Sequence, residues 1–187
     1  MSQEIIGIDR LREGQKDEEL TNYTYSFKEP LSLDYVYGQP KVIARLKDIS
    51  SQLKFHKVYK YWDSNPPKGL LFYGEPGVGK SFCARCFAYE VDATLVELRY
   101  QDIASHFVDK PVEFLNIIKK SVAKLAEEKH VILFMDEIDA FLPARGTHSY
   151  GHDRKVVNFF LTWMSGGFQE NGNVTFLGTT NQPDLLD

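Results

Sequence analysis

A glycine-rich stretch followed by a lysine and a serine is the part of this sequence best suited to chemistry. Residues 74–81 read GEPGVGKS, which matches a glycine, four variable residues, a second glycine, a lysine and a serine or threonine. Glycines let backbone N–H groups converge on an anion, and a helix that starts after them directs its positive end at the same point. Lys80 would then reach the β- and γ-phosphates of a nucleotide, and the Ser81 hydroxyl would ligate Mg²⁺. The alternative is a glycine turn with an exposed lysine, but the apolar run at residues 70–73 favours the phosphate loop.

A second group of polar residues follows an apolar run in VILFMDEIDAF, residues 131–141. Asp136 comes directly after the apolar residues and is placed to hold the water shell of Mg²⁺, while Glu137 is placed to polarise an attacking water molecule. Acids directly after a buried strand are costly unless something pairs them, although a solvated acid cluster is the alternative. Asp139 is compatible with a role in the site and equally with a cap or a surface charge.

A third polar group, Thr179-Thr180-Asn181, ends another apolar run. Asn181 offers both a hydrogen-bond donor and an acceptor, which suits contact with a γ-phosphate or with the attacking water. An asparagine shortly before a proline, here Pro183, is also common in ordinary loops. The order of the three groups along the chain favours the site.

Alternating strands and helices must position these groups. Apolar runs predict strands, and apolar residues spaced three and four apart predict amphipathic helices. Because every strand is apolar throughout and helices separate the strands, we expect an α/β fold with a mainly parallel sheet covered by helices on both faces. The expected strands are residues 69–74, 94–99, 131–136 and 173–181, and the expected helices are residues 42–62, 79–89, 111–129 and 153–164.

The bulk properties predict one domain. The chain has 187 residues, of which 43% are hydrophobic, and this is enough for one well-filled core. Residues 1–25 are charged and non-periodic, which predicts a flexible arm before a core over residues 26–187. The net charge of -4 gives no general attraction for nucleic acid. There is no apolar run of the about 20 residues that a membrane span needs and no signal peptide, so we expect a cytoplasmic protein with reduced, buried Cys83 and Cys86.

With these motifs in this order, the sequence resembles the AAA family, within the AAA+ superfamily of P-loop ATPases. The resemblance lies in PPKGLLFYGEPGVGKS (Walker A), VILFMDEIDAF (Walker B) and TFLGTTNQPDLLD (first sensor), and LDYVYGQPKVIARLKD resembles the segment that lines the adenine pocket. It implies a three-layer αβα P-loop NTPase sandwich whose five parallel strands have the order 5-1-4-3-2. It also implies ATP with Mg²⁺, and a ring of identical or different subunits, usually a hexamer, that remodels or unfolds protein clients.

The roles known in the family carry over onto matching positions of this sequence. The resemblance makes Lys80 the phosphate ligand, Glu137 the catalytic base and Asn181 the sensor, and these three are the candidate catalytic residues. Ser81 and Asp136 match the residues of the magnesium site. The candidate nucleotide-contacting residues are Gly38, Glu75, Pro76, Gly77, Val78, Gly79, Lys80, Ser81, Phe82, Asp136 and Asn181.

Some positions depart from the family pattern. Gly38 matches the adenine segment, but DYVYG replaces the usual pair of glycines. Phe107 and Val108 match the aromatic and aliphatic residues that grip substrate in the central pore, with Asp109 where a glycine is usual and with a core role for Phe107 as the alternative. Gln182 stands where an arginine is usual.

The end of the sequence separates two classes of function. In the family, the chain continues after the position of Asp187 into arginine fingers, a fifth strand and a helical lid, so we expect a large subdomain truncated before these parts. The acids of DEID and the pair Phe107-Val108 favour an ATP hydrolase that remodels protein clients. The missing parts favour the alternative, an ATP-dependent binding or assembly module with little or no turnover. A third class is a relative that acts on DNA, but the negative net charge of the chain argues against it.

Overall fold

The structure is a computed structural model of the chain, and it describes seven stretches of sequence. These are residues 4–7, 24–26, 31–62, 66–100, 111–140, 151–167 and 173–186. The expected pore residues Phe107 and Val108 lie outside the described residues.

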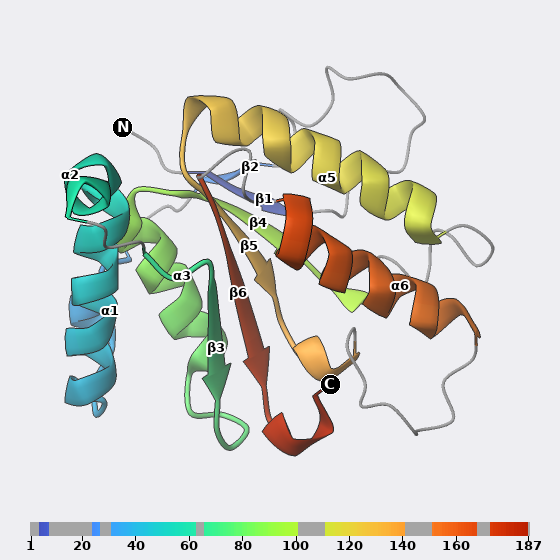
Figure 1. Cartoon of the computed structure of the whole chain (residues 1–187). Coiled ribbons are helices and arrows are strands. Elements are labelled where there is room, and N and C mark those ends of the chain that lie inside the picture. The colour runs from blue at the N-terminus through green and yellow to red at the C-terminus, as the bar shows by residue number, and fades with distance from the viewer. Residues whose placement is uncertain are drawn as a thin grey trace.

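A mainly parallel sheet forms the centre of the molecule (Figure 1). Its strand order is β2-β1-β4-β5-β6-β3, and all neighbouring strands are parallel except β1 and β2. The four strands expected from the sequence are β3, β4, β5 and β6, and their order of 1-4-3-2 agrees with the resemblance. The strands are β1 (Glu4–Gly7), β2 (Thr24–Ser26), β3 (Gly69–Tyr73), β4 (Thr94–Leu98), β5 (Val131–Met135) and β6 (Val174–Thr180).

Helices cover the two faces of this sheet, which confirms the three-layer α/β fold. Figure 1 shows α1, α2 and α3 on one side of the strands and α5 and α6 on the other. Short 3-10 turns at Leu33–Tyr35, Ile138–Ala140 and Pro183–Leu185 and a π-helical turn at Trp163–Gly167 complete the described structure. The helices are α1 (Pro40–Lys54), α2 (His56–Tyr61), α3 (Lys80–Val91), α5 (Pro111–Glu128) and α6 (Gly151–Thr162).

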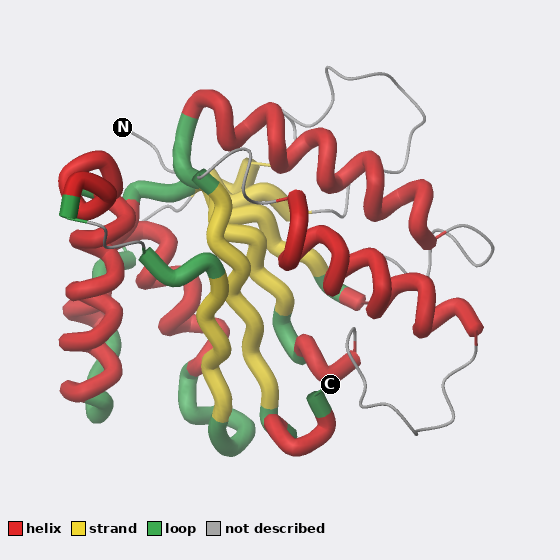
Figure 2. The backbone as a smooth tube through the Cα atoms, in the orientation of Figure 1, coloured by secondary structure: helices red, strands yellow, loops and turns green. Residues whose placement is uncertain are grey.

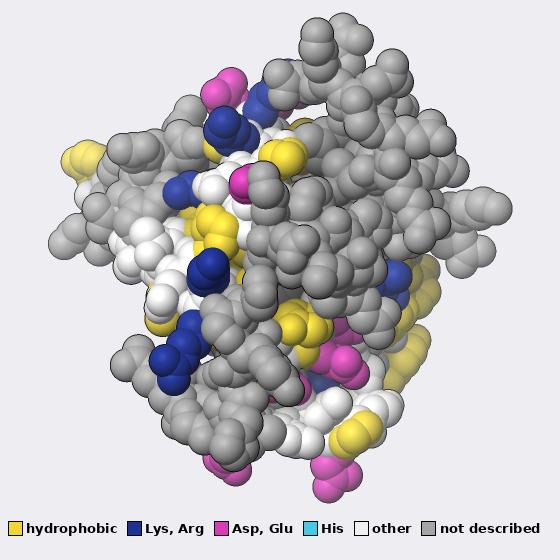
Figure 3. All heavy atoms as spheres, turned by 90° about the vertical axis from the view of Figure 1, so that its right-hand side faces the viewer, with side chains coloured by type: hydrophobic (Ala, Val, Ile, Leu, Met, Phe, Trp, Pro, Cys, Tyr) yellow, Lys and Arg dark blue, Asp and Glu magenta, His cyan; other side chains and the backbone are white. Residues whose placement is uncertain are grey.

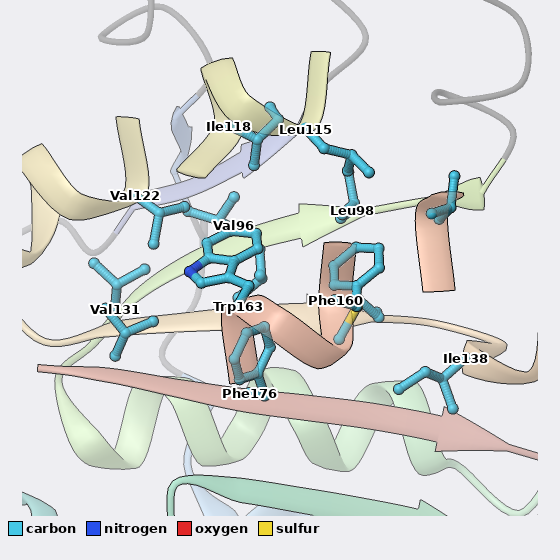
Figure 4. Close-up of a cluster of buried hydrophobic side chains, with 14 of the residues drawn as sticks. Val96, Leu98, Leu115, Ile118, Val122, Val131, Ile138, Phe160, Trp163 and Phe176 are labelled. Carbon is cyan, nitrogen blue, oxygen red and sulfur yellow. The ribbon is translucent and has the colours of Figure 1, made fainter. Parts of the chain in front are cut away.

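Each face of the sheet has its own hydrophobic core. Beneath α5 and α6, Trp163 stacks on Phe160 with ring centroids 6.1 Å apart and meets Phe176 of β6 edge-on (Figure 4). On the other face, buried side chains of α1 and α3 pack against Phe134 of β5 and Leu177 of β6. Because side chains alternate along a strand, β4, β5 and β6 contribute to both cores, which explains why these strands are mostly apolar.

The first expected strand is less buried than its apolar sequence predicts. Leu71 and Tyr73 are 43% and 69% exposed, while Leu70 and Phe72 are partly buried against the α1 and α3 core. In the described structure β3 lies at the edge of the sheet and pairs with β6 alone. Because alternate side chains of β3 are exposed, the expectation of a strand covered on both faces is wrong for β3.

Two short strands lie at the beginning of the chain, where the sequence predicts a flexible arm over residues 1–25. Residues 5–7 pair in parallel with β4, and residues 24–26 pair antiparallel with residues 4–6. Four and three residues are too short to show a period of two in the sequence. These strands arise because the edge of β4 offers unpaired backbone groups that another strand satisfies.

The helix boundaries agree with the predicted ones to within a few residues, except that one predicted helix is divided into two. The continuous helix expected over residues 42–62 is two helices, because the turn at Phe55 separates α1 from α2.

Cys83 and Cys86 are buried and unbonded in α3, as expected, and burial raises the pKa of the Cys86 thiol to about 11. None of the helices in the described stretches has the length and apolar character needed to cross a bilayer.

The backbone trace shows where the three polar motifs meet. β3, β5 and β6 run in the same direction, so the loops that follow them emerge at the same end of the sheet (Figure 2). The carboxyl ends of parallel strands therefore deliver residues from three distant parts of the sequence to one place.

Candidate nucleotide-binding site

The glycine-rich loop has the backbone shape expected of an anion cradle. Gly77 and Gly79 have φ values of 80° and 86°, a region that residues with a Cβ rarely adopt. Gly79 is the N-cap of α3, and its carbonyl accepts the first helical hydrogen bond from the Cys83 N–H at 2.9 Å. The N-terminus of α3, with its unpaired N–H groups and positive dipole end, therefore opens directly onto the loop.

Lys80 links this loop to the end of β6. Its ammonium group donates to the carbonyls of Gly74 and Glu75 at 2.9 and 2.8 Å and to Oδ1 of Asn181 at 2.6 Å. A lysine ammonium has three protons, and these three acceptors match them. The contact brings together two predicted site residues that lie 101 positions apart in the sequence.

Ser81 is joined in the same way to the end of β5. Its hydroxyl lies 3.0 and 2.9 Å from the two carboxylate oxygens of Asp136. A hydroxyl and a carboxylate are hard oxygen ligands of the kind that Mg²⁺ prefers, since Mg²⁺ is usually held by one or two protein groups, waters and phosphate oxygens. The pair predicted to form the magnesium site is therefore adjacent in the structure.

The loop after β5 turns sharply at Glu137. This residue has a φ of 53°, in the left-handed region that is uncommon for residues other than glycine. Its backbone N–H donates to Oγ1 of Thr179 at 3.1 Å, and its side chain is exposed at the mouth of the site. The turn directs the chain back over β6, where a Cβ placed on Gly178 would lie only 2.8 Å from Cδ1 of Ile138.

Two threonines at the end of β6 hold residues 136–140, the segment after β5 that is called the acidic loop below. Thr179 donates a hydrogen bond to Asp136, and Thr180 donates to Oδ1 of Asp139 at 2.6 Å. Both threonines are 1% exposed. Asp139, for which the sequence left a site role and a cap role open, thus anchors the acidic loop to β6.

A pocket of about 340 Å³ lies between the glycine-rich loop, the acidic loop and the end of β6. Binding sites for small molecules start at about this size. Cation, hydroxyl, carboxylate and amide groups converge on it. The pocket is lined by Pro76, Gly77, Gly79, Lys80, Ser81, Phe82, Asp136, Glu137, Thr179, Thr180 and Asn181.

Most of the predicted site residues therefore meet in one place, and a few do not line the pocket. Glu75 contributes its backbone carbonyl to Lys80, and the Val78 side chain is 55% exposed. Gly38 has a φ of 81° in the turn before α1 and is not among the pocket residues. The prediction of an adenine contact at Gly38 stays a prediction.

Sequence reasoning selected Asn181 from the end of β6 and missed the structural importance of its neighbours. Thr179, Thr180 and Gly178 all contact or accommodate the acidic loop. The available signal was the pair of adjacent hydroxyl side chains at the end of a mostly apolar strand, since buried hydroxyl groups require hydrogen-bond partners.

The residues present fit a nucleotide carrying Mg²⁺. The α3 N-terminus and Lys80 supply donors and positive charge for phosphate oxygens, while Ser81 and Asp136 supply hard oxygen ligands. The exposed carboxylate of Glu137 lies at the same pocket. This combination is suited to phosphoryl chemistry.

Comparison with known proteins agrees with this geometry. The model of the ATPase family associated with various cellular activities (AAA) matches residues 70–187. The chain is 31% identical over 191 residues to a proteasome-activating nucleotidase of Methanothermobacter thermautotrophicus, covering 100% of this chain and 46% of the relative. It is 29% identical to the protein of that name from Thermococcus onnurineus, covering 47% of that relative. The chain thus spans about half the length of the curated relatives it matches.

Proposed function

The chain belongs to the AAA family of ATPases, and on that premise we propose that it binds ATP with Mg²⁺ and hydrolyses the terminal phosphoanhydride bond. The observation that carries the proposal is the meeting of three separate motifs. Lys80 contacts Asn181, and Ser81 contacts Asp136, so α3, β5 and β6 each contribute to one pocket.

Each group has a distinct part in the proposed reaction. Lys80 and the N–H groups at the start of α3 bind the phosphate oxygens, which are charged acceptors and therefore stronger than the neutral carbonyls of Gly74 and Glu75. Ser81 and Asp136 would hold Mg²⁺, which when bound supplies positive charge to the β- and γ-phosphates. Asn181 orients the γ-phosphate or the water that attacks it.

Glu137 acts as the general base in this proposal. Its carboxylate accepts a proton from the attacking water while the water oxygen forms a bond to the γ-phosphorus. The bond from that phosphorus to the oxygen bridging the β- and γ-phosphates breaks, which yields ADP and inorganic phosphate. The exposed position of Glu137 beside the pocket gives water access to the carboxylate.

The proposal extends to the use of this energy on protein clients in a ring of subunits, expected to be a hexamer. Two observations support it. The family match covers most of the chain, and the relatives named above are proteasome-activating nucleotidases, a name that links them to a protein-degrading assembly. The expected pore residues Phe107 and Val108 are the candidates for client contact.

The test compares the full-length protein with its Glu137→Gln variant. We expect ATP to raise the melting temperature of both proteins, because binding to the folded state stabilises it. We expect the variant to lose phosphate release by about 10² to 10⁴ fold, the usual contribution of a general base. Glu127→Gln makes the same change at an exposed position at the end of α5 and is the matched control.

The dependence of turnover on protein concentration tests the ring. Specific activity that rises with concentration indicates that subunits act together. Stabilisation by ATP without phosphate release would instead support the nucleotide-dependent binding module, and no stabilisation by ATP would contradict the nucleotide site altogether.

A further inference from the structure

We propose that Thr179 is a positioning residue that sets the magnesium carboxylate Asp136 and the base Glu137 in one fixed arrangement. The inference rests on the proposed function, because it concerns the same ATP site. Thr179 belongs to β6, whereas both acids belong to the loop after β5, so one side chain on a rigid strand connects two functional groups of the neighbouring loop.

The hydroxyl of Thr179 acts both as a hydrogen-bond donor and as an acceptor. It donates its single proton to Oδ1 of Asp136 and accepts the backbone N–H of Glu137 at 3.1 Å. Thr179 is 1% exposed, so water has little access to replace either bond. A buried group that loses its partner under these conditions carries the full cost of desolvation.

The bond to Glu137 matters because the backbone there is unfavourable by itself. A residue with a side chain in the left-handed region is strained and persists only where its surroundings enforce that conformation. At Glu137 the surroundings include the Thr179 hydroxyl and the packing of Ile138 against Gly178, while Thr180 holds the same loop further along at Asp139. Removing the hydroxyl would allow the loop to relax and would redirect the Glu137 carboxylate.

The bond to Asp136 affects the metal site directly. Oδ1 of Asp136 receives both the Thr179 hydroxyl and, at 3.0 Å, the Ser81 hydroxyl. Thr179 thereby fixes the rotation of the carboxylate that faces Ser81. Second partners of this kind orient metal ligands, and their loss weakens metal affinity by about 10 to 100 fold.

The remainder of the site is independent of Thr179. Lys80 is oriented by Gly74, Glu75 and Asn181, and the glycine-rich loop is shaped by its own backbone. Nucleotide binding without Mg²⁺ should therefore survive the loss of the Thr179 hydroxyl, while Mg²⁺ binding and turnover should not. A residue that only stabilised the fold would reduce all three properties together.

The test uses Thr179→Val, which keeps the shape of the side chain and removes the hydroxyl, and Thr179→Ser, which keeps the hydroxyl. Thr175→Val is the matched control. Thr175 is also 1% exposed on β6 and has its hydroxyl 3.0 Å from Nε2 of His130, at the opposite end of the strand from the pocket. The full-length protein and the three variants are compared in kcat, KM for ATP, the Mg²⁺ concentration giving half-maximal nucleotide-induced stabilisation, and affinity for a fluorescent ADP without Mg²⁺.

For Thr179→Val we expect kcat to fall at least about tenfold and the half-maximal Mg²⁺ concentration to rise by a similar factor, as for a lost hydrogen bond to a charged metal ligand. We expect the Mg²⁺-free affinity for ADP to stay within about twofold of wild type. Thr179→Ser should recover most of the activity, and Thr175→Val should keep wild-type kcat and Mg²⁺ dependence. If Thr179→Val does not fold, Thr179→Ala is judged by the same criteria.

Two results would overturn the inference. One is wild-type kcat and Mg²⁺ dependence in Thr179→Val, and the other is a Thr179→Ser variant as defective as Thr179→Val. If the wild-type protein binds nucleotide but does not hydrolyse it, the proposed hydrolysis fails on its own. The Mg²⁺ midpoint of nucleotide-induced stabilisation then decides the role of Thr179, and an unchanged midpoint in Thr179→Val contradicts it.

Discussion

The ammonium nitrogen of Lys80 lies 2.6 Å from the side-chain oxygen of Asn181, so the first residue of α3 contacts the residue that follows β6. This contact connects the phosphate loop with the sensor position. It places a group able to orient the γ-phosphate or water next to the cation that would bind the phosphate.

Replacing Asn181 by alanine is expected to affect turnover more than binding. The variant keeps Lys80 and the α3 N-terminus, so the affinity for nucleotide should change little. A missing positioned polar group lowers kcat by about 10² to 10³ fold in related cases. Steady-state kinetics and nucleotide titration of Asn181→Ala measure both quantities, with Asn116→Ala on the exposed face of α5 as control. Equal losses in kcat and affinity would contradict this division of roles.

Gly178 should be intolerant of any side chain because Ile138 packs directly above it. A Cβ at this position would lie 2.8 Å from Cδ1 and 3.3 Å from Cβ of Ile138. We expect Gly178→Ala to lower the free energy of unfolding by about 1 to 3 kcal/mol and to reduce turnover by displacing the acidic loop. Ile138→Val removes the nearest atom, so the double variant should be more stable and more active than Gly178→Ala. A double-mutant cycle with no coupling would show that the two positions are independent.

Arg85 of α3 and Glu97 of β4 form an ion pair whose acidic partner is buried. The Arg85 Nη2 atom lies 3.1 and 3.3 Å from the two carboxylate oxygens, and Glu97 is 6% exposed. Arg85→Met leaves this carboxylate without its nearest cation, and we expect a loss of about 3 kcal/mol in the free energy of unfolding.

The double variant Arg85→Met with Glu97→Leu should recover part of that loss, because two apolar side chains need no ionic partner. Urea unfolding of the two proteins measures the difference. A double variant less stable than Arg85→Met would show that the carboxylate is stabilised by other groups, among which Arg99 Nε lies 3.6 Å away.

His130 should make the protein less stable in mild acid. Burial, with a smaller contribution from His56, lowers the pKa of His130 from its ordinary value of 6.5 to about 4. Between these pH values the unfolded chain binds a proton at His130 and the folded chain does not. The contribution of His130 to stability is therefore complete above pH 6.5 and is lost as the pH falls toward about 4.

Urea unfolding at several pH values in this window checks the effect of His130. His130→Gln removes the titrating group, so its free energy of unfolding should fall less steeply with decreasing pH than that of the wild type. Parallel pH profiles for the two proteins would show that other groups cause the acid sensitivity.

Much of the fold follows from local sequence patterns. The apolar runs at β4, β5 and β6 and the three-and-four spacing in α5 identified these elements to within a few residues, whereas the same spacing predicted α1 and α2 as one helix. The pattern failed for β3, because a short apolar run looks the same whether helices cover one face of the strand or both. It also could not foresee β1, whose pairing with β4 depends on which edge of the sheet is available.

The same limit applies to the site. The sequence by itself determined the phosphate loop, since three glycines, Lys80 and Ser81 act through local backbone geometry and short spacing. The sequence also indicated that Asp136, Glu137 and Asn181 are candidate site residues, because each follows a predicted strand. Only the tertiary structure decided that Thr179 touches both acids and that Gly178 must be small for Ile138 to fit. These contacts join residues about 40 positions apart, and their geometry depends on the register of two parallel strands, which no local pattern of residues encodes.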